Sequence, residues 1–158
     1  MIEIRRATSD DVGTLVEFAA ALTREDSGHR DPFANTSWAE TEGHQRYGEV
    51  VTDPSAGCFL AFAAGIPVGY ISGSIKPPDT FTRATEARIG SLYVAATHRG
   101  QRVGELLVEA FLAWAREQRA DRVTVSAFAS NHGGLRFYER VGFKPHAVSL
   151  QLPLVPDA

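Results

Sequence analysis

The chain has 158 residues and a net charge of −3, with 44% hydrophobic and 22% charged residues. This length and balance are typical of a globular protein with a sizeable core, so residues 1–158 are expected to form a single domain. The small negative charge argues against a protein that coats nucleic acid or an anionic membrane. No apolar run reaches the roughly 20 residues that span a bilayer, and the first residues contain no signal-peptide core, so we expect a cytoplasmic protein.

The chain opens with a predicted strand and helix. Apolar and charged residues alternate over residues 2–5, as in a half-buried strand. Thr8 and Asp11 have the spacing of a capping pair at a helix start, and apolar residues then recur at helical spacing to about Thr23. The polar, turn-rich residues 24–36 predict a loop or a mobile cover.

The later elements follow from the same periodicities. They are expected to be a helix over 37–51, strands over 58–64, 68–75 and 87–94, a helix over 103–119, a strand over 123–129, a helix over 131–141 and a strand over 143–154. Antiparallel strands come first and a β-α-β crossover follows. This order predicts an α/β fold class with a mixed, mostly antiparallel sheet flanked by helices.

The only cysteine, Cys58, lies inside the first apolar run of the predicted hairpin. One cysteine excludes an internal disulfide. Nothing near it in the sequence would lower its pKa, so we interpret Cys58 as a core residue and not as a nucleophile. The five histidines lack the spacing of metal ligands, and no metal cofactor is expected.

A polar turn joins the predicted strand ending at Val94 to the helix that follows. Its residues are Arg99, Gly100, Gln101, Arg102, Val103 and Gly104. A helix start leaves backbone N–H groups unpaired, and with the helix dipole these donors form an anion site. The turn lacks the Gly-Lys-Ser/Thr of a Walker A loop and the dinucleotide pattern Gly-x-Gly-x-x-Gly. A plain strand-to-helix connection is the alternative.

A second segment runs from Asn131 to Phe143, with the string Phe137-Tyr138-Glu139-Arg140-Val141-Gly142-Phe143 at its end. Its apolar residues could simply form a core stripe, with Asn131 as a helix cap and Gly142 as a helix stop. That interpretation explains the helix alone. It does not explain why this string follows the first turn after one intervening strand.

Together the two segments resemble the GNAT superfamily of N-acetyltransferases. The family's coenzyme loop, Arg/Gln-x-x-Gly-x-Gly/Ala, follows an apolar-aromatic-Val strand end, and its second motif combines Asn with a later Phe/Leu-Tyr-Glu-x-x-Gly-Phe. The resemblance covers nearly the whole chain and implies a GNAT-like fold whose splayed sheet binds acetyl-CoA. It implies coenzyme contacts from Leu92, Tyr93, Val94, Arg99, Gly100, Gln101, Arg102, Val103, Gly104, Asn131 and Tyr138.

One position departs from the family pattern, because Arg102 replaces the first glycine of the coenzyme loop. If that position needs a positive φ or a close backbone approach, arginine would impair coenzyme binding. If it lies in the first helical turn with an ordinary φ, only its N–H matters, and the side chain adds a cation near the phosphates. We favour the second alternative.

The implied reaction is attack of an amine on the acetyl-CoA thioester, which requires an acid for the departing thiolate and a proton acceptor for the amine. The family pattern assigns the acid to Tyr138. For the base, the best-aligned place holds Arg88, and Glu86, two residues earlier on the same strand face, is our candidate. His98 is interpreted as structural.

The acceptor amine is not specified by any motif. Its site is expected to lie among residues 24–36, residues 76–85 and the last strand, where Glu25, Asp26 and Asp31 could attract a cation. A small-molecule amine is favoured, and an aminoglycoside-like compound, an amino acid and a protein lysine or N-terminus stay open. The alternatives to an enzyme are an acetyl-CoA-binding sensor and a nucleotide-binding module of another fold. Relatives of the family are often dimers, so the resemblance implies a homodimer.

Overall fold

A computed structural model describes residues 1–156. The strands are β1 (Ile2–Arg6), β2 (Ala56–Ala63), β3 (Ile66–Lys76), β4 (Glu86–Val94) and β5 (Arg122–Val125). The α-helices are α1 (Val12–Glu25), α2 (Ser27–Arg30), α3 (Trp38–Val50), α4 (Val103–Glu117) and α5 (His132–Arg140), with 3-10 turns η1 (Ser9–Asp11) and η2 (Ala96–His98). No helix in this part of the chain is both long and apolar enough to span a bilayer.

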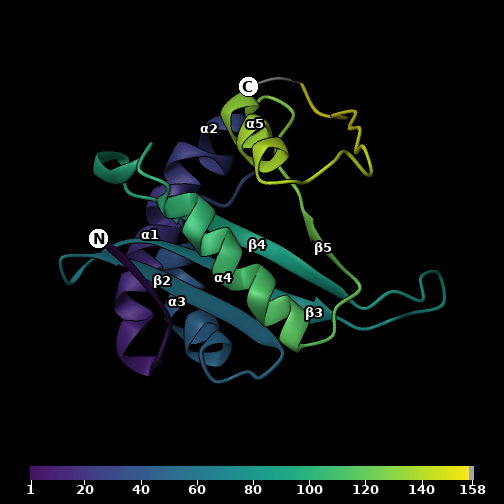
Figure 1. Ribbon diagram of the computed structural model, residues 1–158. Coiled ribbons are helices and arrows are strands. Elements are labelled where there is room, and N and C mark those ends of the chain that lie inside the picture. Colours follow the sequence, from purple (N-terminus) through teal and green to yellow (C-terminus); the bar gives the residue numbers. More distant parts are fainter. Residues whose placement is uncertain (157–158) are drawn as a thin grey trace.

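The strands form one sheet in the order β1-β2-β3-β4-β5, with every neighbouring pair antiparallel except the parallel pair β4–β5. Helix α4 covers one face, and α1 and α3 cover the other (Figure 1). Successive side chains of a strand point to opposite faces of the sheet, so the same strands contribute to the apolar layer on each face. Leu60 and Tyr70 face α1 and α3, whereas Ala61 and Ile71 face α4. The predicted mixed, mostly antiparallel sheet flanked by helices is confirmed.

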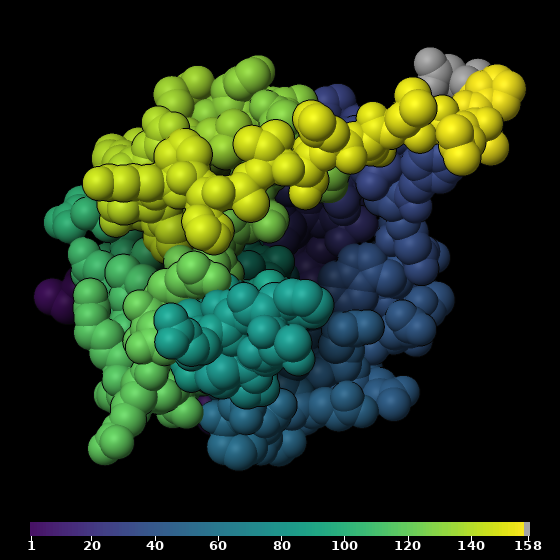
Figure 2. Space-filling view, turned by 90° about the vertical axis from the view of Figure 1, so that its right-hand side faces the viewer, coloured from purple at the N-terminus to yellow at the C-terminus, as the bar shows by residue number. Residues whose placement is uncertain are grey.

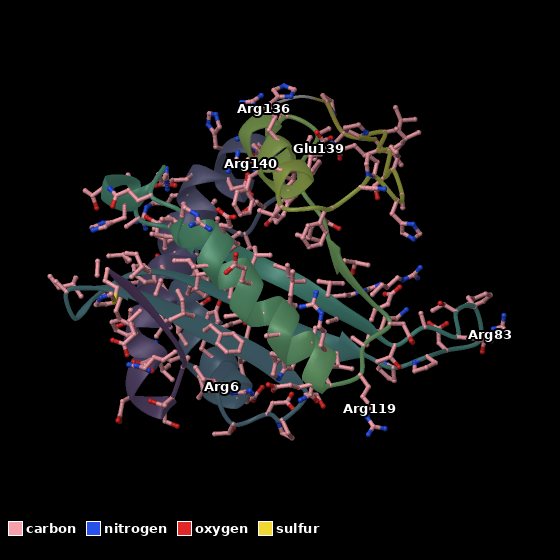
Figure 3. All side chains as sticks on the ribbon, in the orientation of Figure 1. Arg6, Arg83, Arg119, Arg136, Glu139 and Arg140 are labelled. Carbon is pink, nitrogen blue, oxygen red and sulfur yellow. The ribbon has the colours of Figure 1, made fainter. Side chains whose placement is uncertain are left out.

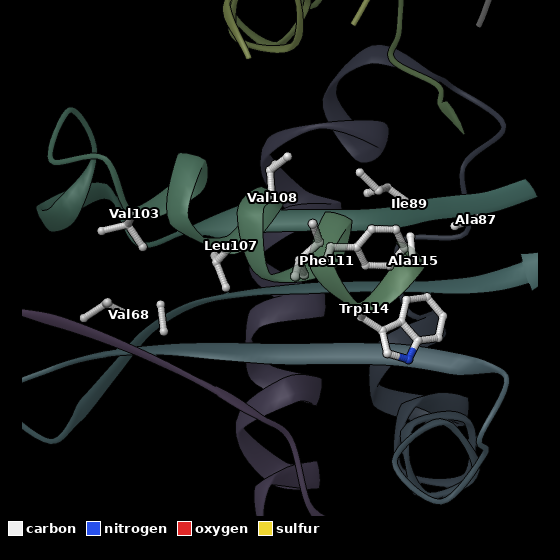
Figure 4. Close-up of a cluster of buried hydrophobic side chains, with 11 residues drawn as sticks. Val68, Ala87, Ile89, Val103, Leu107, Val108, Phe111, Trp114 and Ala115 are labelled. Carbon is white, nitrogen blue, oxygen red and sulfur yellow. The ribbon is translucent and has the colours of Figure 1, made fainter. Parts of the chain in front are cut away.

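Helix α4 contributes the largest apolar stripe of the core (Figure 4). Val103, Leu107 and Phe111 are all buried against the sheet. At the far end of this stripe the Trp114 ring lies directly against Gly57 of β2, where a Cβ atom would stand 2.6 Å from the ring. The absence of a side chain at Gly57 therefore lets α4 approach the sheet closely.

A β-bulge changes the direction of β4 near its middle. Ser91 pairs with Ser72 and Ile89 pairs with Gly73, so Gly90 is the extra residue. A bulge bends its strand and increases the local twist. The parallel pairing with β5 ends beside it, at Ile89 and Val125, whereas β4 continues to Val94 paired only with β3. The sheet therefore opens between β4 and β5, as the family resemblance implied.

Two local predictions are confirmed: Thr8 and Asp11 form a capping pair, and Cys58 is a core residue. The Asp11 carboxylate accepts hydrogen bonds from the Thr8 N–H at 2.8 Å and from Arg5 at 2.8 and 2.9 Å. These bonds hold the pKa of Asp11 at about 2. Cys58 is buried, and burial raises the pKa of its thiol to about 12.

Three predicted boundaries are wrong. Residues 24–36 are not all loop, because α1 continues to Glu25 and is followed by α2. Strand β5 ends at Val125 instead of 129, because β4 has already diverged and offers it no further partner. The strand predicted over 143–154 does not form, since no other described strand lies beside this segment to bond with it.

Candidate active site

A cleft of about 1010 Å³ occupies the space where β4 and β5 separate. It is bounded by the end of α1, α2, residues 98–105, β4, and α5. The charged residues that line it are five arginines and three carboxylates, namely Arg24, Arg30, Arg99, Arg102, Arg140, Glu25, Asp26 and Glu105. This surplus of cations lies in a chain whose net charge is −3, so the cleft is suited to an anionic ligand.

The loop before α4 supplies unpaired donors to this cleft. The first helical hydrogen bond of α4 is made by the Leu106 N–H to the Arg102 carbonyl. Within the described chain, the N–H groups of residues 101–104 have no hydrogen-bond acceptor. Gly100 and Arg102 both have positive φ, which makes this loop irregular before the helix begins. Successive free N–H groups at a helix start bind phosphate oxygens well.

The expected ordinary backbone at Arg102 is wrong. Its φ is +65°, in the left-handed region, and it is the N-cap residue of α4. The family's glycine is therefore replaced by a residue that bears a strain of about 1 kcal/mol. The Arg102 side chain points to solvent, where its Nε lies 3.0 Å from Glu105, so it leaves the backbone N–H groups accessible.

Arg99 connects three parts of the cleft. Its Nε donates to the Val94 carbonyl at 2.8 Å, and its Nη2 lies 2.6 Å from the Glu25 carboxylate at the end of α1. Its guanidinium also stands 5.6 Å from the centre of the Tyr93 ring. Of the coenzyme residues expected from the sequence, all except Gln101 line the cleft. His98 also lines it, with its ring nitrogen 2.8 Å from the Thr97 hydroxyl.

The unpaired edge of β4 forms one wall. Leu92, Tyr93 and Val94 bond to β3 on one side and have no strand on the other, because β5 has diverged. Across the cleft, Asn131 caps α5 by accepting a hydrogen bond from the Gly134 N–H at 2.9 Å. That bond uses the side-chain oxygen of Asn131 and leaves its two amide hydrogens for a ligand.

Tyr138 reaches the same cleft from α5. Its ring packs edge-on against Phe137 and Phe143, with centroid separations of 5.2 and 5.6 Å. Burial, with a smaller contribution from the nearby Asp26 carboxylate, raises the pKa of the phenol to about 12. The hydroxyl is therefore protonated at neutral pH, and it makes no hydrogen bond to another described residue. Arg140 lines the cleft from the same helix, whereas Arg136 and Glu139 do not (Figure 3).

The structure does not bring Glu86 into this site. Glu86 begins β4, at the end of the strand away from the coenzyme loop, and it lines neither cavity. Arg122 and Arg88 both bond its carboxylate, and the Arg122 hydrogen bond lowers its pKa. A carboxylate that is buried between two guanidinium groups is a weak proton acceptor.

A second cavity of about 370 Å³ adjoins the cleft, and Gly90 and Ser91 belong to the walls of both. Asp26 is its only charged residue among those described, with one carboxylate oxygen 2.7 Å from Arg30. The other residues give it aromatic and hydroxyl-bearing walls, including Trp38, Tyr70, Phe128, Ser27, Ser91 and Ser126. Sequence reasoning named Asp26 but missed the serines and aromatics, because they lie on separate elements and belong to no motif.

The other acidic residues and segments suggested for the acceptor lie elsewhere. Glu25 lines the larger cleft, but Asp31 and residues 76–85 line neither cavity. Residues 143–154 also lie outside both. Among the described residues, no group of three or more His, Cys, Asp or Glu side chains is arranged to hold a metal ion.

Comparison with known proteins identifies relatives of this chain. Residues 15–143 match the model of the Acetyltransferase (GNAT) family. N-alpha-acetyltransferase 30 of Dictyostelium discoideum is 29% identical over 86 residues, which are 54% of this chain and 45% of that protein. The chain thus matches less than half of the length of that relative.

Solved structures share the fold at low sequence identity. A variant of the BH1408 protein from Bacillus halodurans superposes with a TM-score of 0.86 at 18% identity, over 97% of this chain and 99% of that one. A predicted acetyltransferase with acetyl-CoA from Clostridium acetobutylicum superposes with a TM-score of 0.76 at 16% identity, over 98% and 97% of the two chains.

Proposed function

Because the chain belongs to the GNAT acetyltransferase family, we propose that it is an acetyl-CoA-dependent N-acetyltransferase of a compact primary amine. The described chain then forms one acetyltransferase domain in which the amine attacks the thioester directly. The observation that carries the proposal is the cleft itself. One end holds free N–H groups and cations, the middle offers an unpaired strand edge, and the other end meets a second cavity beside Tyr138.

Each part of the coenzyme has a partner of matching chemistry. The free N–H groups of residues 101–104 would bind the pyrophosphate at the start of α4, with Arg140 adding positive charge. The open edge of Leu92–Val94 would pair with the amides of the pantetheine arm, as an added strand does. The free amide hydrogens of Asn131 would donate to the same arm from the opposite wall.

Two side chains would serve the transfer. An amine with a pKa near 10.4 must lose a proton before it attacks, which costs roughly 4.6 kcal/mol at pH 7. Asp26 lies where the two cavities meet and would hold the cationic amine and the cationic nitrogen that forms on attack, with the proton leaving through water. The protonated Tyr138 would donate a hydrogen bond to the departing thiolate. We therefore prefer Asp26 to Glu86 as the carboxylate that assists the amine.

The size and charge of the second cavity favour a compact cationic acceptor. A volume of about 370 Å³ lies at the low end for small-molecule pockets. Its aromatic and hydroxyl-bearing walls suit a short apolar chain that also carries polar groups. The relative from D. discoideum is named an N-alpha-acetyltransferase, so the α-amine of a peptide is the second acceptor to test.

The first experiment is calorimetric titration of the purified protein with acetyl-CoA, CoA, ATP and NAD, run beside an amine panel scored for thiol release. Selective acetyl-CoA binding with thiol release from any small amine or peptide supports the proposal. Binding without turnover over the whole panel would make the protein a coenzyme sensor. Preference for ATP or NAD would refute the coenzyme assignment.

The acceptor role of Asp26 has its own test. Asp26→Asn should raise KM for a cationic amine about 10- to 100-fold, because it removes a charge-assisted hydrogen bond, and should leave acetyl-CoA affinity unchanged. Asp31→Asn is the matched control, since Asp31 lines neither cavity. Equal KM values for the two variants would exclude Asp26 as the amine site.

A further inference from the structure

Arg30, the last residue of α2, joins the end of α1 to the loop that precedes α5. Its Nε donates to the Asp26 Oδ1 at 2.7 Å, and its Nη1 donates to the Ser130 hydroxyl at 3.0 Å. A guanidinium has five N–H donors. Three of them, including both on Nη2, have no acceptor among the described residues. Arg30 also lines the coenzyme cleft, so a cation with free donors borders the proposed site of transfer.

Asp26 and Arg30 are one contiguous pair of opposite charges where the two cavities meet. Asp26 lines both cavities, and Arg30 lines the cleft. Only the Oδ1 atom of Asp26 bonds Arg30, so its second oxygen can accept from an ammonium group. The two side chains are 28% and 23% exposed. Because water screens a half-buried pair only in part, its charges act on a bound ligand.

This pair favours some acceptors over others by their charge. A single ammonium group would share Asp26 with Arg30 and leave the site with a net positive charge. Arg24, which also lines the cleft, forms no ion pair with a described residue, so an acceptor with several ammonium groups would meet further repulsion. An α-amino acid carries an ammonium and a carboxylate on one carbon. Its ammonium can meet Asp26 while its carboxylate meets Arg30, and the four charges then alternate in sign.

The walls of the second cavity are suited to an apolar side chain. The Thr23 hydroxyl donates to the Ala19 carbonyl at 2.9 Å and accepts from the Trp38 Nε1 at 2.9 Å. The Tyr70 hydroxyl lies 3.0 Å from that of Tyr47. Since these polar groups are already bonded within the protein, the walls that they belong to offer a ligand mainly ring faces and carbon atoms.

Figure 2 shows a hollow on the face of the molecule where this cavity lies. Helix α1, in purple, is visible at the bottom of the hollow, between the blue helices α2 and α3 and the green-to-yellow segment after β5. The second cavity has walls on the same elements. An acceptor that enters from this face brings its charged end to the junction with the cleft, and its side chain stays between the aromatic walls.

We propose that the acceptor is an α-amino acid with an apolar side chain, whose ammonium binds Asp26 and whose carboxylate binds Arg30. This inference rests on the proposed acetyltransferase function of the same site. The amine nitrogen bonds the acetyl carbon, and the carbon–sulfur bond breaks. Of the two protons that the ammonium loses, one leaves through water and one neutralises the thiolate. The product has lost the positive charge that Asp26 held, which favours its release.

The first test compares acceptors that share a side chain. One series is leucine, leucinamide, isopentylamine and leucylglycine, and the other is phenylalanine, phenylalaninamide and phenethylamine. In thiol release, kcat/KM should be at least about 10-fold higher for each acid than for its analogues. The amide has the less basic amine and therefore more neutral amine at pH 7, so amine basicity cannot produce this preference. A smaller ratio in both series overturns the inference, and turnover of the analogues would leave the acetyltransferase function standing.

The second test removes the guanidinium. Arg30→Gln should lower kcat/KM for leucine about 10- to 100-fold more than for isopentylamine, because only leucine has a carboxylate to lose its partner. Arg136→Gln is the matched control, since Arg136 lines neither cavity, and it should keep the wild-type ratio. Equal losses on leucine and isopentylamine in Arg30→Gln would show a structural role for Arg30 and would overturn the inference.

A third measurement separates this inference from the proposed function. Calorimetric titration of the CoA-saturated protein with leucine and with isopentylamine requires no turnover. Tighter binding of leucine that is lost in Arg30→Gln, with no thiol released from acetyl-CoA by any acceptor, would support the amino-acid site and refute the acetyltransferase. Thiol release from isopentylamine with no binding preference for leucine would support the acetyltransferase and refute the amino-acid site.

Discussion

Removal of the Tyr138 hydroxyl is the sharpest test of the proposed chemistry. Burial raises the pKa of this phenol to about 12, whereas an ordinary thiol has a pKa near 8.5. At equilibrium the proton therefore stays on the tyrosine and not on the thiolate. We expect Tyr138 to stabilise the leaving group as a hydrogen-bond donor, without transferring its proton completely.

The free energy of this hydrogen bond sets the expected loss of rate. A hydrogen bond to a charged group contributes about 1.5–3 kcal/mol, which corresponds to a loss of roughly 10- to 150-fold in kcat for Tyr138→Phe. A complete proton transfer would allow a loss of up to about 10⁴-fold. The hydroxyl has no hydrogen-bond partner among the described residues, so its removal should change the free energy of unfolding by less than about 0.5 kcal/mol.

The assay measures thiol release at saturating substrates, with acetyl-CoA affinity measured separately by calorimetry. Tyr47→Phe is the control, because Tyr47 is a buried tyrosine outside both cavities whose hydroxyl lies 3.0 Å from that of Tyr70. Since the Tyr138 pKa is raised, its protonated form and the rate that depends on it should persist until the pH approaches 12. An unchanged kcat in Tyr138→Phe, or a loss explained by weaker acetyl-CoA binding, would refute the reasoning.

Three further predictions concern stability and the coenzyme loop. Gly57→Ala should lower the free energy of unfolding by about 1–3 kcal/mol, because its Cβ would stand 2.6 Å from the Trp114 ring; thermal unfolding measures this. The Asp11 pKa is lowered from 3.8 to about 2 in the folded chain, so its carboxylate contributes about 2 kcal/mol above pH 4, and this is lost as the pH falls towards 2. Denaturant titrations should show that Asp11→Asn removes this acid dependence, and a parallel pH profile for both proteins would contradict it. Arg102→Gly should retain acetyl-CoA affinity because the backbone N–H remains, whereas Arg102→Pro should abolish it, since proline has no N–H and cannot adopt a φ of +65°. Equal binding by these two variants would exclude the backbone as the phosphate site.

Local patterns predicted most of the fold. The helical spacing of residues 103–115 and the apolar runs on both sides of residue 65 act over short distances, and the structure has α4 and the β2–β3 hairpin there. The wrong predictions concern segments that need a neighbouring strand to bond with. Residues 126–129 and 143–154 have the composition of strands, but a strand needs a neighbour, and the divergence of β4 removes it in the first case.

The position of the cleft was predictable where it depends on the backbone at the ends of elements. The loop before α4 and the edge of β4, which line the cleft, lie at the positions that the first of the two segments indicated. The left-handed backbone of Arg102 was not predictable, because arginine rarely adopts it and the loop imposes it. The partners of Glu86 were hidden for a different reason, since Arg122 is 36 residues away in sequence and meets it only through the parallel pairing of β4 with β5.

The wall that the two cavities share has a kinetic consequence. Gly90 and Ser91 line both cavities, so on the proposed assignment the coenzyme in the cleft and the amine in the second cavity each have their own space and both can be bound at once. Initial velocities should therefore give double-reciprocal lines that intersect, as a ternary complex requires, and not the parallel lines of a ping-pong scheme. Desulfo-CoA, which cannot transfer an acetyl group, should inhibit competitively against acetyl-CoA but not against the amine.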